Sequence, residues 1–476
     1  MNTQAVRIIS LPSAEKETPK PQAVPVPSAD VQQQTTLPMD LSPDALGPVV
    51  DPFAALADAM GGADFAHASL GRVLAEIATL QAQNRWQDIL ELFHPVEDRE
   101  PALVAHGLDT EVRSSLGFVL GQLKRFDQAL AELRICVQRD PENFRYRSSL
   151  GYTLMSSLQA ANAREIILPG QEKKTRLQEA HDHFRKAQAI LPDRVTPFYR
   201  EGRLFKDFDR KPDKALPLLA QAVRNWEEYS METRLSRHQE RKNAVKARYA
   251  LASCMIVEGQ AASALEHVRT VIEEDARTSY LKSEHKHFAE GKALHALGRF
   301  GEALKALDAA GLFTNPTDGD YIHELAGRCH LSLGNPDLGL QAVERIPQKA
   351  RRPYVRWTEA DCLVALGRTD DARRILLSSC ERDRRGRHKG LIRLARIAYN
   401  QGNFAEVAAF AEKAVAFHME TYSTPCADGL FWQAVAALRS GQRERALSFE
   451  RDLAAHRPLY PWLPKLRQAL REGGRQ

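Results

Sequence analysis

The sequence predicts an all-α protein, an α-solenoid of about ten helix-turn-helix repeats. Apolar residues recur at helical spacing in paired stretches from about residue 66 onwards. No stretch shows the alternation of apolar and polar residues that is typical of a β-strand. Five glycines follow one another at intervals of 36, 33, 35 and 39 residues: Gly298, Gly334, Gly367, Gly402 and Gly441. We expect each to supply the left-handed or unhindered backbone that ends a helix.

Residues 1–65 precede the first helical pattern and are rich in Pro, Ala, Gln and Ser. We expect this tail to be disordered, because such a segment cannot bury enough apolar surface to offset its loss of chain entropy. Its first 60 residues carry three basic and seven acidic side chains, a net charge of −4, whereas the whole chain carries +5. The short apolar segments 6–11 and 52–56 are either docking motifs or ordinary parts of a linker.

The clearest repeat spans residues 116–141. One apolar face carries Leu116, Leu120 and Leu123, and a second carries Ala129, Leu133, Cys136 and Val137 before Pro141 ends the unit. Two short helices joined by a tight turn cannot each bury an apolar face alone. They must pack on each other and on a neighbouring copy.

This stretch resembles the tetratricopeptide repeat family, whose pattern runs Trp-x2-Leu-Gly-x2-Tyr, then Ala-x3-Phe, then Pro. Leu116, Gly117 and Leu120 stand for the first half of the pattern, and Ala129, Leu133 and Pro141 for the second; Arg113 replaces the Trp, and Leu120 replaces the Tyr. The resemblance covers roughly residues 66–460. It implies a right-handed superhelix with a concave groove that binds peptide segments or helices of partner proteins.

The other repeats are assigned in chain order. The first runs from Ala66 to Pro95, and the third from Leu150 to Pro192. The third contains an insertion near residues 159–176, which we place in the turn between its helices, with plain helix extension as the alternative. The fourth repeat ends near Ala222, so residues 66–225 form the N-terminal set.

Residues 226–247 are heavily charged and poor in apolar side chains, which predicts one long helix that mostly faces solvent. Residues 248–476 hold the fifth to tenth repeats. The stretch from Pro458 to Leu470 is expected to form a capping helix over the last seam.

The apolar runs and the cysteines of the sequence indicate the cellular compartment. The apolar runs are only a few residues long, so no transmembrane helix is predicted, and the N-terminus lacks a secretory apolar region of useful length. We therefore expect a cytoplasmic protein. Six cysteines are scattered without a CxxC pair and are expected to be reduced thiols in the core: Cys136, Cys254, Cys329, Cys362, Cys380 and Cys426.

No catalytic constellation is found, and neither a metal nor a cofactor is predicted. His181 and His183, like His285 and His287, stand two residues apart, which splays their side chains by about 200° on a helix. We interpret all four as surface histidines. The sequence contains no HExxH, GxSxG or GxxxxGK[ST] motif. The protein is therefore not expected to be an enzyme; a cryptic site in the 159–176 insertion is the remaining alternative.

Positive charge concentrates between Lys349 and Arg396, where fourteen basic side chains face six acidic ones. Arginine dominates, which suits bidentate recognition of carboxylate or phosphate groups. The candidate partner-binding residues are Arg382, Arg384, Arg385, Arg387, Lys389, Arg393 and Arg396. A solvated loop with local Arg–Asp pairs is the alternative.

These observations predict a protein-protein interaction scaffold or adaptor, with the basic patch docking an acidic peptide, a nucleic acid or the acidic tail of the chain itself. One subclass of the family clamps a C-terminal carboxylate with Lys and Asn. Ser114 and Phe118 stand at the matching positions of the clearest repeat, so that clamp is not predicted. RNA binding through the patch is the alternative function, although few aromatic residues accompany the arginines.

Overall fold

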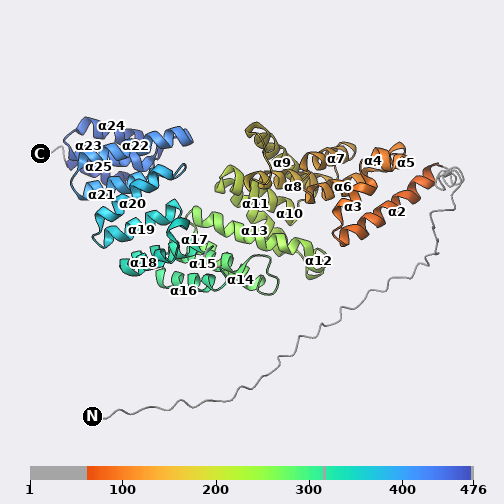
Figure 1. Cartoon of the computed structure of the whole chain (residues 1–476), viewed down its shortest axis with the longest axis horizontal. Helices are drawn as coiled ribbons and strands as arrows, with labels where there is room; N and C mark the ends of the chain where they lie inside the picture. The colour runs from red at the N-terminus through yellow and green to blue at the C-terminus, as the bar shows by residue number, and fades with distance from the viewer. Residues whose placement is uncertain (1–61, 315–317, 473–476) are drawn as a thin grey trace, which may run out of the picture. The chain divides into compact units, whose positions relative to one another are not determined.

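The computed structural model describes residues 62–314 and 318–472, and residues 62–476 form one compact unit. The predicted disorder of residues 1–61 lies outside the described residues, whereas residues 62–65, which were assigned to the tail, are helical. Figure 1 shows the helices of the compact unit in chain order. Within the described ranges no β-strand is present, so the all-α prediction is confirmed.

The described helices form ten consecutive pairs, eight of them joined by a tight turn of three residues. They are α2 (Gly62–Ala82) with α3 (Trp86–Phe93), α6 (Thr110–Gln122) with α7 (Phe126–Arg139), α8 (Phe144–Asn162) with α9 (Gly170–Ile190), α10 (Val195–Leu204) with α11 (Pro212–Glu228), α13 (His238–Val257) with α14 (Ala261–Glu274), α15 (Ser283–Ala296) with α16 (Phe300–Gly311), α17 (Asp320–Ser332) with α18 (Pro336–Glu344), α19 (Pro353–Ala365) with α20 (Thr369–Arg382), α21 (Arg387–Asn400) with α22 (Phe404–Tyr422), and α23 (Ala427–Arg439) with α24 (Arg443–His456).

Short elements connect or end these pairs. They are α4 (Val96–Arg99), α5 (Pro101–Ala105), the π-helix η1 (Phe205–Asp209), α12 (Met231–Ser236), the 3₁₀ turn η2 (Gln348–Ala350) and α25 (Leu463–Glu472). Helix α25 packs on α23 and α24, where the capping helix was expected.

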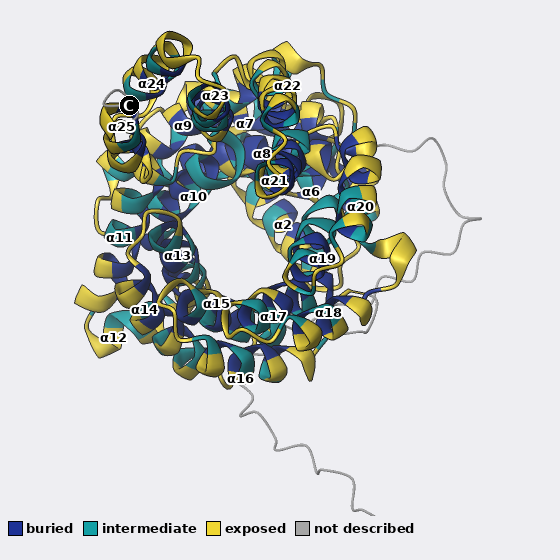
Figure 2. Cartoon of the chain, turned by 90° about the vertical axis from the view of Figure 1, so that its left-hand side faces the viewer, coloured by how far each residue is buried: buried dark blue, intermediate teal, exposed yellow. Residues whose placement is uncertain are grey.

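The two helices of a pair form two layers. In Figure 2 the first helices α10, α13, α15, α17 and α19 lie beside the central opening, and their partners α11, α14, α16, α18 and α20 lie outside them. Each pair also packs on the next, so the buried residues lie in the seams between helices rather than in one central core.

All ten turns pass through a left-handed residue. Six of these residues are glycines with φ between 74° and 78°: Gly259, Gly298, Gly334, Gly367, Gly402 and Gly441. The next residue donates its N–H back to the first helix, as Arg299 does to the Leu294 carbonyl at 2.9 Å. This bond satisfies a carbonyl that the helix end leaves without a partner. The role predicted for the repeated glycines is confirmed.

A second set of glycines allows the two helices of a pair to approach closely. A Cβ on Gly117 would lie 2.6 Å from Leu133 Cγ, and one on Gly151 would lie 2.8 Å from Phe184 Cε1. Leu133 and Phe184 are both fully buried. The absence of a side chain at these positions is what allows the large residue of the second helix to fill the seam.

The prediction of one long helix at residues 226–247 is wrong. Helix α11 ends at Glu228, and Ser230 begins a new helix by accepting the Thr233 N–H at 3.1 Å. Helix α13 then begins at His238 as the first helix of the fifth pair. Its residues Ala244 and Val245 are buried, so this segment is part of the packed structure rather than a solvated arm.

The insertion near residues 159–176 lies mostly in helix. Only residues 163–169 connect α8 to α9, and these helices are 19 and 21 residues long, compared with 13 and 14 for α6 and α7. Pro169 immediately precedes the first residue of α9. The added turn of α9 is held because buried Arg176 pairs with Asp127 of α7 and with Glu172 at 2.8 Å.

Two other expectations concern the whole described unit. All six cysteines are free and buried, as predicted. Among the described residues, no helix combines the length and the apolar character that a membrane span requires.

The seam between α6 and α7 provides a test of packing. Leu133 and Ala129 are fully buried there. Leu133→Ala should lower the free energy of unfolding by about 2–5 kcal/mol because it opens a cavity. Ala129→Leu should lower it by about 1–3 kcal/mol because it forces the helices apart. Urea denaturation measures both; stabilities equal to that of the parent would show that the seam is misassigned.

Two glycines with opposite backbone roles provide a matched pair. Gly298 has φ 74° in a turn, whereas Gly71 lies inside α2, where an added Cβ would meet no neighbouring atom within 4 Å. Gly298→Ala should destabilise the protein by about 1–2 kcal/mol. Gly71→Ala should stabilise it by up to about 1 kcal/mol, since alanine is the better helix former. Melting temperatures that move in the same direction for both variants would contradict this account of the turns.

Candidate functional site

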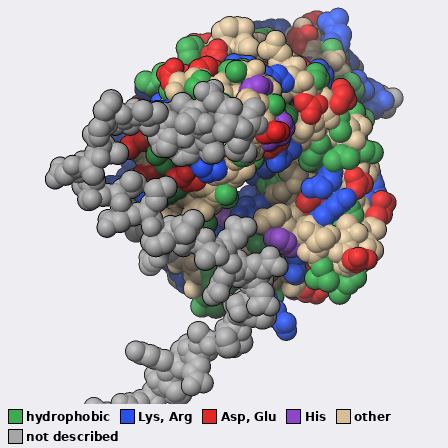
Figure 3. All heavy atoms as spheres, turned by 90° about the vertical axis from the view of Figure 1, so that its right-hand side faces the viewer, with side chains coloured by type: hydrophobic (Ala, Val, Ile, Leu, Met, Phe, Trp, Pro, Cys, Tyr) green, Lys and Arg blue, Asp and Glu red, His purple; other side chains and the backbone are tan. Residues whose placement is uncertain are grey.

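A basic groove lies along consecutive first helices, where a hollow of about 470 Å³ opens between α8, α10 and α13. Its cationic lining comes from the residue before α10, from α10 itself and from α13: Arg194, Arg200, Arg203, Lys242 and Lys246. Lys, Arg and His side chains lie beside a hollow on the face that Figure 3 presents.

Two of these cations have carboxylate partners. Arg194 pairs at 2.8 Å with buried Glu240, which also accepts hydrogen bonds from the Val195 N–H and the Tyr229 hydroxyl. Arg203 pairs with Asp207 at 2.5 Å. Among the described residues, the other three cations of the groove make no ion pair within 4.0 Å: Arg200, Lys242 and Lys246. The groove therefore has an uncompensated positive charge.

Two of these cations have lowered pKa values. Burial lowers the pKa of Arg200 to about 10. Burial also lowers the pKa of Lys246, and the neighbouring charges of Lys242 and Arg203 lower it further. An anion bound between these groups would oppose both effects, because an opposite charge favours the protonated form.

Further cations lie beyond the groove on η1, α15 and α17, where Lys206 pairs with Asp207 at 2.9 Å and Arg328 lies 4.0 Å from Glu324. Burial lowers the pKa of Lys292 on α15, and the charges of Lys206 and Arg328 add to the effect. His295, one turn further along α15, has its pKa lowered to about 4 by burial and by Arg328. Lys206 of η1 and Arg328 of α17 are thus close enough to Lys292 of α15 to affect its protonation.

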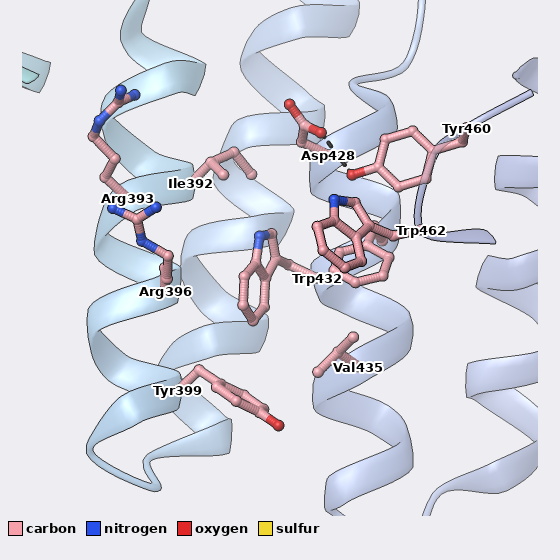
Figure 4. A pocket seen from close by; sticks show the side chains of 10 residues that line it. Ile392, Arg393, Arg396, Tyr399, Asp428, Trp432, Val435, Tyr460 and Trp462 are labelled. Atoms are coloured by element: carbon pink, nitrogen blue, oxygen red, sulfur yellow. Dashed lines mark hydrogen bonds between the residues drawn. The ribbon is translucent and has the colours of Figure 1, made fainter. Parts of the chain in front are cut away.

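An aromatic pocket of about 520 Å³ lies near the C-terminal end, between α21, α23 and the segment before α25 (Figure 4). Its aromatic lining consists of Tyr399, Phe431, Trp432, Tyr460 and Trp462. Trp462 is half exposed, whereas Tyr460 is buried and donates its hydroxyl to Asp428 at 2.7 Å. Burial and this hydrogen bond raise the pKa of Tyr460.

Two arginines form the polar side of the aromatic pocket. Arg393 and Arg396 come from α21 and share Asp361, at 2.9 and 2.5 Å. Asp428 also lines the pocket, so the two guanidinium groups are balanced by two carboxylates beside the apolar rings. Such a pocket suits an apolar or aromatic side chain.

The seven arginine and lysine residues predicted as a patch do not form one surface. Arg393 and Arg396 line the aromatic pocket, and Lys389 lies 5.5 Å from the centre of the Trp357 ring. Arg382 lines a separate hollow between α20 and the segment before α19. Arg387 is held by the Cys380 carbonyl at 2.7 Å.

Arg384 and Arg385, the remaining two, are exposed on the loop between α20 and α21. Asp383 accepts the backbone N–H groups of Arg385 and Gly386 at 2.9 and 2.7 Å, and the Arg385 carbonyl accepts the Tyr422 hydroxyl at 2.6 Å. The loop backbone is therefore fixed, while neither arginine side chain has a carboxylate partner within 4.0 Å among the described residues. Their role in partner binding stays a prediction.

The comparisons with known proteins match one helix pair to a protein family. Residues 353–377 match the family model described as tetratricopeptide repeat. The match starts with α19, crosses the Gly367 turn and reaches into α20, so it covers one of the ten similar pairs. In these residues the chain is similar to a tetratricopeptide repeat. No curated protein sequence matches it.

Solved structures of tetratricopeptide repeat proteins are similar to parts of the chain at low identity. One from Parabacteroides merdae is 12% identical with a TM-score of 0.40, and the alignment covers 62% of this chain and 99% of that one. YrrB, described as a TPR protein with an unusual peptide-binding site, is 19% identical with a TM-score of 0.33, covering 51% and 96%. A thermophilic TPR protein in Thermus thermophilus is 19% identical with a TM-score of 0.32, covering 50% and 99%.

The interpretation of His181 as a surface residue is wrong. His181 is 4% exposed and lies between two carboxylates, 3.2 Å from Glu201 and 3.0 Å from Asp209. Its ring also packs on Phe205, with centroids 4.3 Å apart. The residue thereby ties α9 to α10 and to the π-helix. No local sequence signal marks it, because its partners lie 20 and 28 residues away.

The basic groove of the repeat protein was also missed from sequence. Its unpaired cations Arg200 and Lys242 stand 42 positions apart, with a whole second helix between them. The sequence signal that could have revealed it is the position of each cation within its repeat. Arg203 and Lys292, for example, each stand one residue after a glycine of a first helix. Equal registers on successive first helices face the same side of a solenoid.

His388 offers a test of the ordered α20–α21 loop. Burial, followed by the charges of His418 and Lys389, lowers its pKa to about 4. The ring should therefore stay neutral when folded, whereas in the unfolded chain it should take up a proton near pH 6.5. The contribution of neutral His388 to the free energy of unfolding should be fully present above pH 6.5 and should fall as the pH drops toward 4.

Thermal melts from pH 7 to 4 measure this dependence, and His388→Gln should make it shallower. His456→Gln, at the exposed end of α24, is the control and should leave the slope unchanged. An NMR titration in which His388 protonates near pH 6.5 would contradict the assignment.

Proposed function

We propose that this protein is a tetratricopeptide repeat protein and a non-catalytic interaction scaffold that binds extended acidic segments of partner proteins along its first helices. The observation that carries the proposal is the basic groove, in which Arg200, Lys242 and Lys246 have no carboxylate partner within 4.0 Å among the described residues. Partly buried cations without counterions, such as Arg200 and Lys246, are unfavourable unless an anion joins them.

The geometry of packed helices suits such a ligand. Neighbouring helix axes lie about 8–10 Å apart, and residues three apart in an extended peptide are separated by about 10 Å. Acidic residues at that spacing would meet cations on successive first helices. The aromatic pocket would provide an anchor for one apolar side chain, since a few well-packed aromatic contacts carry much of the affinity of an interface.

Single-stranded nucleic acid is the alternative occupant, because it too would be attracted to the groove and to exposed Arg384 and Arg385. Base stacking needs free aromatic faces. In the groove the Arg200 guanidinium lies 4.1 Å from the centre of the Tyr152 ring, and Arg203 lies 5.9 Å from that of Tyr199. These faces are already occupied, which favours the acidic peptide.

The cellular setting is proposed on a separate ground. All six cysteines are free, and each is buried in the helical unit. Free thiols suit a reducing compartment. We therefore propose that the scaffold works in the cytoplasm.

The groove can be tested by charge reversal. The double variant Lys242→Glu/Lys246→Glu should lose most of the partners that the parent captures in quantitative affinity purification, because each reversal turns an attraction into a repulsion. Capture by the parent should weaken with added salt, since exposed charges are screened. Mass spectrometry of the eluates measures the loss.

The matched control is Lys305→Glu/Lys413→Glu, on the second helices α16 and α22, where both lysines are exposed. It makes the same change in net charge and should keep the partners. Equal losses in both double variants would show that only the overall charge matters, and the groove would be rejected. Loss of RNA rather than of proteins from the eluate would favour the alternative function.

A further inference from the structure

A second basic hollow lies between η2 and α20, and it shares no residue with the basic groove or the aromatic pocket. It measures about 360 Å³. The charged and hydroxyl residues that line this anion pocket include Lys349, Arg351, Arg356, Arg374, Ser379 and Arg382. No carboxylate is among the described residues that line it.

The floor of the anion pocket is built from two fixed arginines. Arg351 has a side chain that is 6% exposed; its Nε donates to the Ile346 carbonyl at 2.9 Å and its Nη1 to Glu359 Oε1 at 2.6 Å. Arg356 donates to Glu359 Oε2 at 3.1 Å and to the Gln348 carbonyl at 2.8 Å. One carboxylate therefore serves two guanidinium groups, and each of these is already oriented.

The rim adds donors that have no partner. Lys349 and Arg382 make no ion pair or side-chain hydrogen bond within the described part of the chain. The Ser379 hydroxyl also has no hydrogen bond there, although the residue is 8% exposed. Arg374 shares Asp371 with Arg368. The pocket thus keeps several positive charges beyond those that Glu359 and Asp371 compensate.

We propose that the anion pocket binds a phosphate monoester. A dianion with three terminal oxygens can accept from several arginine and lysine donors at once, and arginine is the side chain best suited to such bidentate recognition. A single carboxylate would neutralise only part of the charge. The hydroxyl of Ser379 supplies a neutral donor beside the arginines.

Two sources present the same terminal group, a phosphorylated serine or threonine of a partner and a small phosphorylated metabolite. The pocket recognises this shared chemistry rather than its source. The site is independent of the proposed scaffold function, because its residues lie outside both surfaces that carry that proposal.

The test uses the full chain and three probes: the peptide Ala-Ala-phosphoSer-Ala-Ala, the same peptide with Glu in place of phosphoserine, and adenosine 5′-monophosphate. Calorimetric titration gives the affinities, and phosphorus-31 NMR reports contact with the phosphate itself. At least one phosphorylated probe should bind about tenfold or more tightly than the Glu peptide, which corresponds to about 1.4 kcal/mol. Preference for the peptide or for the nucleotide identifies the source.

The variant Lys349→Ala/Arg382→Ala removes two rim cations that make no ion pair or side-chain hydrogen bond among the described residues, so the fold should be kept, which circular dichroism checks. It should weaken binding of the phosphorylated probe about tenfold or more. The control Arg384→Ala/Arg385→Ala removes two exposed arginines nearby that do not line the pocket, and should leave binding within about twofold. Equal loss in both variants, equal affinity for the Glu peptide, or no phosphorus signal change would each overturn the proposal.

Discussion

The structure depends on one steric constraint, the close approach of the two helices within each pair. A large side chain of the second helix, such as Leu133 or Phe184, fills the space that a missing Cβ leaves on the first, at Gly117 or Gly151. Fully buried side chains of this size carry much of the stability of a seam. The approach also fixes where the chain must reverse, and the left-handed residue in each of the ten turns within the described pairs, with φ between 56° and 78°, meets that requirement.

Because of this constraint, the residues that pack the helices differ from those that are available to bind a ligand. Apolar residues are used in the seams between helices, so the surface of the first helices is free to carry other chemistry. In the middle repeats that surface carries cations such as Arg200 and Lys246, whose pKa values are lowered by burial and, for Lys246, by neighbouring cations. Such an arrangement does not stabilise the fold, since like charges held together repel. These cations line the hollow between α8, α10 and α13, so their presence bears on ligand binding rather than on folding.

The fold could be predicted because its signals are local. Helical periodicity, the glycine turns and the buried cysteines all lie within single repeats, and the ten pairs follow from them. The interruption of the helix at residues 229–237 was not predictable from composition. It depends on the N-cap at Ser230 and on Glu240. The partners of Glu240 lie outside α13: Arg194 precedes α10, and Tyr229 follows α11. His181 was misjudged for the same reason, since its carboxylates lie on other elements.

The candidate site was harder to predict because charge density along the chain differs from charge density in space. The run from Arg382 to Arg396 is dense in sequence, but helix geometry and the α20–α21 loop divide it among the aromatic pocket, the anion pocket and exposed loop positions. The basic groove shows the opposite case, because each first helix contributes only a few cations and stacking brings them together. In a solenoid the residues that share a surface recur at the repeat length. Charges that act together are therefore found by comparing equal positions in successive repeats, rather than by searching for a basic run.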